Sequence, residues 1–312
     1  MNKTSPREVR IATAPVSFGV DEVIADDAWM PQPDEMLAWM AELGYTGTEM
    51  GPPGFLGEPA LVRQRLAALE LGLVGAFLPQ HFSRRERAAE DRRWLDGELQ
   101  SLLESSPPGS KPFAVLSEAI DEPVRLAWTG RTTSKPEARL PADRWDVLVD
   151  NLHAGAELCR SRDVEPVFHP HAGTYIETAD EIDQLMSRID PSLIGLCLDT
   201  GHFRYGGADP ASSIRAYAAL LRHVHIKDCS VAVRDEVAGR GQGLEEAVRL
   251  GVFCPLGAGD ANIDDAIGAL RDVQYSGWIV VEQDQFLSTD DTPDSVVAGQ
   301  RDNLEYLLAR GL

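Results

Sequence analysis

The segment GLCLDTGHFRYG, residues 195–206, gives the clearest indication of the fold. Its first five residues form an apolar run that ends in the carboxylate Asp199, and the turn residues Thr200-Gly201 lead to His202. A short apolar run followed by turn residues is typical of a strand buried on both faces of a parallel sheet. Ligands bind at the carboxyl ends of such strands, which makes Asp199 and His202 candidate site residues. Alternatively, Asp199 only caps the next turn and His202 packs beneath it.

Outward from this segment, strand-like and helix-like stretches alternate along the whole chain. Helices are expected from about residues 34, 59, 84, 145, 178, 211, 263 and 295, the first one capped by Asp34. Residues 231–250 form an insertion, which we expect to contain a helix of its own. The predicted strands are residues 9–16, 46–50, 73–78, 113–116, 164–168, 195–199, 223–228 and 278–283. This alternation predicts an α/β fold, a single (β/α)8 TIM barrel over residues 1–312 with no domain boundary.

Composition and charge narrow the class of protein. The chain has 50 acidic and 29 basic residues and a formal charge of −21, which would repel a nucleic acid. No apolar run approaches the ~20 residues that span a bilayer, and the start, MNKTSPREVR, lacks the apolar core of a signal peptide. We therefore expect a cytoplasmic protein that binds neither nucleic acid nor membrane and acts on a small neutral or metal-chelating molecule. The four cysteines show no CxxC spacing and are expected to be reduced thiols.

Imidazoles and carboxylates gather at the ends of the last four predicted strands. Side chains two residues apart on a strand share a face, so each histidine pair can point into the barrel mouth. Histidine with carboxylate suits a divalent transition ion and requires no thiolate. Each histidine taken alone could instead be a hydrogen-bonded structural residue. The group comprises His169, His171, Asp199, His202, His223, His225, Lys227, Asp228, Glu282 and Asp284.

Six motifs follow one another in a recognisable order. They are GYTGTEMGPPGFLG (44–57), HPHAGT (169–174), LDTGHFRYGGADP (198–210), HVHIKD (223–228), FCPLGAGD (253–260) and GWIVVEQD (277–284). In these motifs, of which LDTGH and HxHxKD are the most specific, the chain resembles the xylose-isomerase-like TIM barrel superfamily. Within it, the chain is most similar to the inosose (2-keto-myo-inositol) dehydratases and their sugar isomerase and epimerase relatives.

The resemblance implies a divalent metal ion held by Asp199, His225 and Glu282. The superfamily usually has a glutamate as fourth ligand at the end of the fifth strand, where this chain has HPHAG. This leaves open whether His169, His171 or neither binds the metal; we choose His171 as the ligand and His169 as a substrate contact. Mn²⁺ or Co²⁺ is the expected ion, with Zn²⁺, Fe²⁺ and Mg²⁺ as alternatives.

The resemblance also implies roles in catalysis. A base next to the metal would remove a proton from a keto-cyclitol and form a metal-stabilised enediolate. Glu49 is the expected base, with Glu282 as the alternative, and His202 or a metal-bound water is the expected acid. Glu49 could instead be a strand-end residue bonded to the neighbouring loop.

Three further residues are expected to contact the substrate. Lys227 would hold a hydroxyl or the developing oxyanion, unless it only pairs with Asp228. Trp29 and Phe55 would form an apolar wall over a sugar ring, unless they simply pack in the core.

The sequence therefore favours a lyase that dehydrates a keto-cyclitol in inositol catabolism. A sugar isomerase or epimerase would share every residue named above, and a lyase that cleaves 3-oxo-glycosides is a further alternative. An abasic-site endonuclease is disfavoured by the negative charge. A non-catalytic sugar- or metal-binding protein is the alternative from a different class, and it would be favoured if Glu49, Asp199, His225 and Glu282 proved dispensable for turnover. A homo-oligomer is also expected, because relatives often form one.

Overall fold

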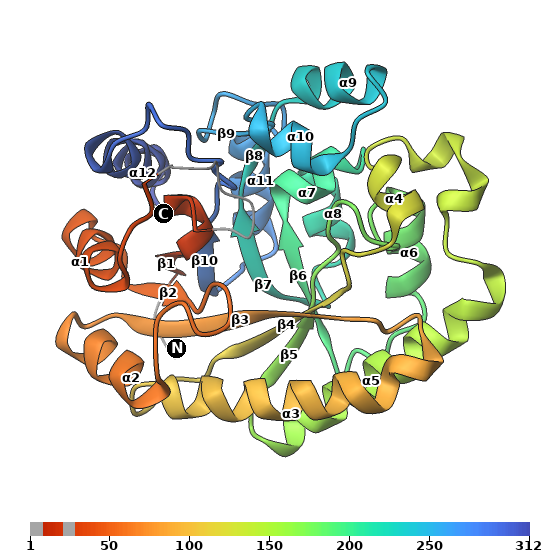
Figure 1. Cartoon of the computed structure of the whole chain (residues 1–312), viewed down its shortest axis with the longest axis horizontal. Coiled ribbons are helices and arrows are strands. Elements are labelled where there is room, and N and C mark those ends of the chain that lie inside the picture. The colour runs from red at the N-terminus through yellow and green to blue at the C-terminus, as the bar shows by residue number, and fades with distance from the viewer. Residues whose placement is uncertain (1–8, 21–28) are drawn as a thin grey trace, which may run out of the picture.

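Eight parallel strands close into a barrel (Figure 1). The computed structural model describes residues 9–20 and 29–312. The strands pair in chain order, and β1 with β10 closes the ring. They are β1 (Val9–Thr13), β2 (Gly47–Glu49), β3 (Gly72–Gln80), β4 (Phe113–Glu118), β5 (Glu165–Phe168), β6 (Gly195–Asp199), β7 (Leu221–Ile226) and β10 (Gly277–Val281). The predicted (β/α)8 barrel is confirmed, whereas the extent of the domain over residues 1–312 stays a prediction.

Helices surround the barrel, and short helices lie in the connections at its carboxyl end. No helix in the described residues has the length and apolar character required to cross a membrane. The surrounding helices are α1 (Pro33–Leu43), α2 (Pro59–Ala68), α3 (Ala88–Ser105), α5 (Trp145–Ser161), α6 (Ala179–Met186), α8 (Pro210–Ala216), α11 (Ile263–Asp272) and α12 (Pro293–Leu308). The shorter helices are η1 (Pro15–Phe18), η2 (Arg85–Arg87), α4 (Pro123–Ala127), η3 (Thr132–Ser134), η4 (Pro136–Ala138), η5 (Ala142–Arg144), α7 (Thr200–Tyr205), α9 (Val231–Gly239) and α10 (Leu244–Arg249).

Two apolar layers hold the barrel together. The larger lies between the strands and the surrounding helices and includes fully buried Leu37, Leu99 and Leu152. A smaller cluster of Val115, Val167 and Cys197 packs with Phe77 and Phe113. Cys197 and Asp199 are two residues apart on β6 and share a face, so this cluster fills the barrel interior below Asp199.

Prolines and caps move several boundaries away from the predicted positions. β1 ends at Thr13, because Pro15, which lacks a backbone N–H for the sheet, begins η1. The prediction that Asp34 caps the first helix is wrong. Gln32 takes the cap position, and Asp34 lies in the first turn, where its charge favours the helix dipole.

The seventh strand ends two residues earlier than predicted. β7 stops at Ile226, and Asp228–Cys229 form a separate strand, β8, which pairs antiparallel with β9 (Phe253–Cys254). Lys227 therefore lies at the junction between the barrel and this small sheet. The insertion between β8 and β9 contains α9 and α10, which project at the top of the view in Figure 1.

Buried charges connect the long segment between β4 and α5 to the first turn of α6 and to the loop that precedes it. Arg125 is fully buried and donates two hydrogen bonds to Glu181, of 2.7 and 2.6 Å. Glu177 accepts backbone hydrogen bonds from Gly130 of this connection and from Gly173 of the β5 loop, at 2.9 and 2.7 Å. Paired buried charges of this kind are costly to break, so the two loops are held as one unit.

Candidate active site

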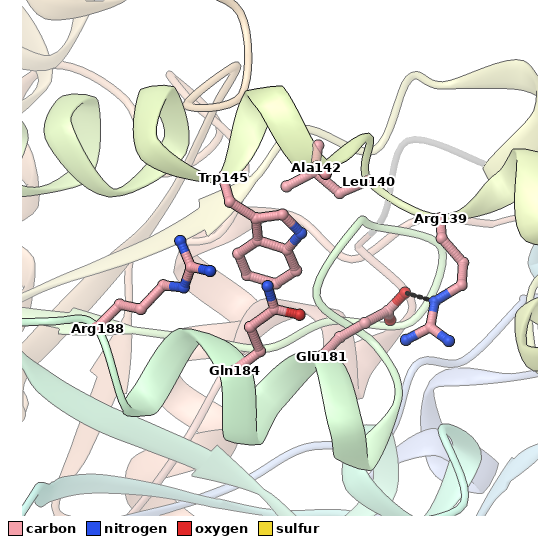
Figure 2. A pocket seen from close by; sticks show the side chains of 7 residues that line it. All are labelled: Arg139, Leu140, Ala142, Trp145, Glu181, Gln184 and Arg188. Atoms are coloured by element: carbon pink, nitrogen blue, oxygen red, sulfur yellow. Dashed lines mark ion pairs between the residues drawn. The ribbon is translucent and has the colours of Figure 1, made fainter.

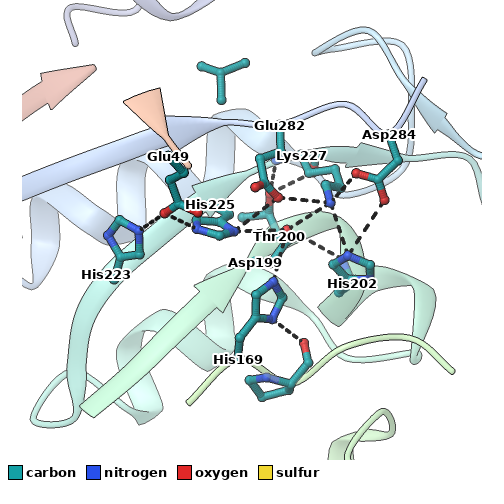
Figure 3. Close-up of polar contacts among 12 residues, drawn as sticks. Glu49, His169, Asp199, Thr200, His202, His223, His225, Lys227, Glu282 and Asp284 are labelled. Carbon is teal, nitrogen blue, oxygen red and sulfur yellow. Dashed lines mark hydrogen bonds and ion pairs between the residues drawn. The ribbon is translucent and has the colours of Figure 1, made fainter. Parts of the chain in front are cut away.

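Four side chains at the carboxyl ends of neighbouring strands meet in the barrel mouth. His169 follows β5, Asp199 ends β6, His225 lies on β7 and Glu282 follows β10. Asp199 and His225 are register partners on adjacent strands, which brings their side chains to the same level. One ligand atom from each of the four residues lies within 4.8 Å of the others, and all four residues are buried. Figure 3 shows them turned toward one another.

The donor atoms of this group fit a metal ion. Asp199 Oδ1 accepts the backbone N–H of His202 at 2.9 Å and thereby caps α7. Within the described residues, Asp199 Oδ2 and His225 Nδ1 are buried and have no hydrogen-bond partner. Asp199 Oδ2 lies 3.9 Å from His169 Nε2 and 3.8 Å from His225 Nδ1. Unpartnered buried polar atoms are costly, and a divalent cation between them would satisfy both.

Glu49 lies behind His225 and orients it. Its Oε1 accepts hydrogen bonds from His225 Nε2 at 3.2 Å and from His223 Nε2 at 2.8 Å. The Nε2 proton of His225 is therefore directed to Glu49, which leaves Nδ1 for a metal. Burial raises the pKa of the Glu49 carboxyl, but the charge of His225 and the histidine hydrogen bonds outweigh it and lower that pKa to about 2. The predicted catalytic base is thus a carboxylate already bound by two histidines.

The structure brings His169, rather than the predicted His171, into the group. The Nδ1–H of His169 donates to Pro170 O at 2.8 Å, which directs Nε2 toward Asp199. His171 donates from Nδ1 to Ala172 O at 2.8 Å. Its ring centre lies 3.8 Å from that of His202. Burial lowers the pKa of both His169 and His171, so both are neutral imidazoles at neutral pH.

Lys227 lies among the carboxylates of the mouth. Its Nζ is 3.4 Å from Asp199 Oδ2, 3.1 Å from Glu282 Oε2 and 2.7 Å from Asp284 Oδ1. It therefore does not pair only with Asp228. Burial lowers the pKa of Lys227, but Asp199, Asp284 and Glu282 raise it well above the usual value, and the ammonium stays charged.

The LDTGH motif holds Lys227 in place. Thr200 Oγ1 donates to the carbonyl oxygen of Lys227 at 2.7 Å and accepts the Lys227 backbone N–H at 2.9 Å. A Cβ added at Gly201 would lie 2.6 Å from Cγ of Lys227, so only glycine allows this close approach. The two most specific motifs of the sequence therefore fit against each other.

His202 lies at the edge of the group beside Lys227. Its Nε2 is 3.1 Å from Lys227 Nζ, and its Nδ1 accepts the backbone N–H of Ala172 at 3.3 Å. Burial, followed by the neighbouring His171 and Lys227, lowers the pKa of His202 well below its usual value. The ring of Phe253 lies 4.9 Å from the His202 ring and forms an apolar side of the mouth.

Asp228, which the sequence groups with the strand-end site residues, instead holds the loop that follows β9. Its Oδ1 accepts from the backbone N–H groups of Cys229 and Ala261, at 2.8 and 3.0 Å. Its Oδ2 accepts from those of Gly257 and Gly259, at 2.9 and 3.1 Å. The side chain is almost fully buried, so these four bonds replace its hydration. The HVHIKD and FCPLGAGD motifs are thus parts of one structural unit.

Trp29 and Phe55 are partly buried and pack against the main core cluster. Trp29 also lies 5.9 Å from Trp39, ring centre to ring centre. These contacts support core packing as their role, and the apolar wall over a substrate stays a prediction.

Two other features offer less to a ligand. Cys197, His223 and His225 also bring donor atoms within 4.8 Å, but burial raises the pKa of the Cys197 thiol to about 11, which disfavours a thiolate ligand. A cavity of about 300 Å³ lies between α6 and the segment leading into α5 (Figure 2). The arginines on its rim are already paired, Arg139 with Asp180 and Arg188 with Asp146.

Comparison with known proteins gives the same architecture. The family model described as xylose isomerase-like TIM barrel matches residues 37–307. The inosose dehydratase of Geobacillus kaustophilus (strain HTA426) is 34% identical over 278 residues, covering 88% of this chain and 87% of its own length. That of Geobacillus thermodenitrificans (strain NG80-2) is 36% identical over 286 residues, covering 89% and 90%.

Solved structures agree in fold at low sequence identity. The IOLI protein with a binding zinc atom superimposes with a TM-score of 0.71 at 14% identity, covering 97% of this chain and 99% of its own. D-allulose 3-epimerase from Methylomonas sp. in complex with D-allulose gives 0.68 at 16% identity, covering 98% of both chains. At these identities the likeness shows the fold alone.

Proposed function

Because the chain belongs to the xylose isomerase-like TIM barrel family, we propose that it is a metal-dependent lyase that dehydrates a keto-cyclitol, as an inosose dehydratase does. The observation that carries the proposal is the buried group of His169, Asp199, His225 and Glu282, in which Asp199 Oδ2 and His225 Nδ1 make no hydrogen bond to any other described residue. Relatives named inosose dehydratase match almost nine-tenths of the chain, which supports this reaction.

The four residues of this group would hold one divalent ion, for which Mn²⁺ or Co²⁺ is our choice. Two imidazoles with two carboxylates suit such ions, and their charges balance. When bound, the ion would act as a Lewis acid that polarises a substrate carbonyl and makes the adjacent C–H more acidic.

Glu282 is our choice of base for that proton. Its contacts with His225 and Lys227 both involve Oε2, at 3.1 Å, which leaves Oε1 to face a substrate. Burial raises the pKa of Glu282, but His225 and Lys227 lower it well below its usual value and keep the carboxylate ionised. Glu49, already bound by two histidines, is the positioning partner of His225.

His202 and Lys227 would protonate the departing hydroxyl. Their nitrogens lie 3.1 Å apart. Because the imidazole of His202 is neutral, the proton would come from the charged ammonium of Lys227, which would become a neutral amine, and His202 would position that ammonium. His171 and Phe253 lie against His202 on this side of the mouth.

The composition of the group favours dehydration over epimerisation. Epimerisation requires a base and an acid on opposite faces of one carbon. In this group the residue after β5 is the neutral His169 and not a carboxylate. Asp199 already caps α7, so within the group Glu282 is the carboxylate available as a base. A sugar epimerase is the competing function, because the same four ligands would also bind a ketose.

We place this activity in the cytoplasm and in inositol catabolism, on a small neutral substrate. A net charge of −21 supports the exclusion of nucleic acid as a partner.

The test is metal analysis of the purified protein, followed by an assay for dione formation from 2-keto-myo-inositol with added Mn²⁺ or Co²⁺. We expect about one ion per chain and dehydration. Asp199→Asn should lose both, whereas Asp209→Asn, which changes the matching cap of α8, should lose neither. Metal binding with epimerisation of a ketose instead would favour the competing function, and a protein that binds no divalent ion would contradict the proposal.

A further inference from the structure

The ammonium group of Lys227 contacts the same carboxylate oxygens that a metal would use. It lies 3.1 Å from Glu282 Oε2 and 3.4 Å from Asp199 Oδ2. We propose that Lys227 is an internal counter-cation of the metal site: its ammonium competes with the metal ion for these two oxygens and so lowers the affinity of the site for the ion. Asp284 weakens this competition, because it attracts the ammonium away from the two oxygens. The inference rests on the proposed metal centre.

The two oxygens are identified by their other neighbours. Glu282 Oε2 lies 3.1 Å and Asp199 Oδ2 3.8 Å from His225 Nδ1, the ring nitrogen that faces away from Glu49. The second oxygen of Asp199 is already used by the cap of α7. Lys227 and a metal would therefore share both donor atoms, and not merely the same region.

Lys227 cannot simply move out into solvent. Its side chain is almost completely buried, Thr200 binds its backbone on both sides, and its stem packs on Gly201. A fixed positive charge within a few ångströms of a divalent ion opposes binding of that ion, and the effect is strong where water is excluded.

Asp284 offers the ammonium a place on the far side of Lys227 from His225, as Figure 3 shows. Its Oδ1 makes the shortest of the Lys227 contacts, at 2.7 Å. His202 Nε2, at 3.1 Å, is on the same side. An ammonium pulled toward these two groups leaves more of the charge of Glu282 and Asp199 for the metal.

The test is a calorimetric titration of Mn²⁺ into the full chain after metal is removed with a chelator. Lys227→Met should bind Mn²⁺ about tenfold or more tightly than the wild type, because the competing charge is gone. Lys227→Arg, which keeps the charge, should remain near the wild type. Circular dichroism and thermal unfolding of each variant check that the fold is intact, and Lys227→Gln provides a second neutral side chain if the methionine variant fails to fold.

The variant Asp284→Asn tests the role of Asp284. In the wild-type background this substitution should weaken Mn²⁺ binding, because the ammonium of Lys227 then interacts more strongly with Glu282 and Asp199. In the Lys227→Met background it should have a much smaller effect. An equal loss in both backgrounds would overturn the role of Asp284.

The outcomes separate this inference from the proposed function. If the wild type binds Mn²⁺ and neutral variants at Lys227 bind it no more tightly, the counter-cation is refuted and the metal centre stands. If neither the wild type nor the neutral variants bind Mn²⁺, the metal centre itself is wrong, and the inference with it.

Discussion

Replacement of Glu49 by glutamine should weaken metal binding without removing the chemical step. One carboxylate oxygen accepts hydrogen bonds from His223 and His225, at 2.8 and 3.2 Å, and an amide can neither supply the negative charge nor accept equally well. Loss of such a partner of a ligating histidine costs about 10–100-fold in metal affinity. This corresponds to about 1.4–2.8 kcal/mol.

The assay combines a Mn²⁺ titration with dehydration rates measured over a range of Mn²⁺ concentrations. The activation curve of Glu49→Gln should shift to higher Mn²⁺ and reach nearly the wild-type plateau. Glu118→Gln is a matched control, because Glu118 also ends a barrel strand and is equally buried, but bonds to Ser83 and not to a ligand. Its activation curve should stay in place.

The opposite result would refute the reasoning. If Glu49→Gln binds Mn²⁺ as tightly as the wild type and the plateau rate collapses, then Glu49 is the base, as the sequence alone predicts. Its hydrogen bonds to the two histidines would then not control the affinity for the metal.

Three further predictions follow from single residues. His169→Ala should lose the bound ion while His171→Ala keeps it, as metal analysis will show; the reverse result would restore His171 as the ligand. Asp228→Asn should destabilise the protein to urea by about 1–3 kcal/mol, because buried N–H groups of the loop after β9 lose their acceptor, with Asp209→Asn as the milder control. Burial raises the pKa of Glu118 from 4.5 to about 8, so the folded state keeps the proton of Glu118 and the resulting stability is lost progressively as pH rises from about 4.5 to about 8. Glu118→Gln should therefore gain stability over the wild type by about 4 kcal/mol between pH 5 and pH 9 in thermal or urea unfolding, and parallel pH profiles would contradict this.

The barrel could be predicted from the sequence because its signals are local. Each strand is a short apolar run, and each run is followed by turn residues and a helical pattern. The positions of Asp199, His225 and Glu282 follow from the same logic, since each stands within one residue of a strand end.

The choice between His169 and His171 could not be made in this way. β5 ends at Phe168, and beyond it the alternation of side chains no longer tells which residue faces inward. The direction of His169 is set by its own hydrogen bond to Pro170 O. A local bond of this kind leaves no pattern in the sequence.

Contacts between residues far apart in the chain could not be predicted from the sequence either. Glu49 and His225 are 176 residues apart, and their contact depends on how β2 and β7 face each other across the barrel. The register of β6 against β7 shifts between Leu196 and Cys197, which no spacing of residues indicates. The roles of Asp228 and Thr200 depend on these same three-dimensional arrangements.

The closure of the barrel has a consequence for when the protein could acquire the ion proposed above. Glu282 follows β10, the strand that pairs with both β7 and β1 and so completes the ring. During synthesis the strands that bear His169, Asp199 and His225 leave the ribosome first, and the fourth ligand arrives only with the last strand. A chain interrupted before β10 would carry three of the ligands and neither the closed wall nor Glu282. Uptake of the proposed metal would therefore be a late step, which follows translation of nearly the whole chain.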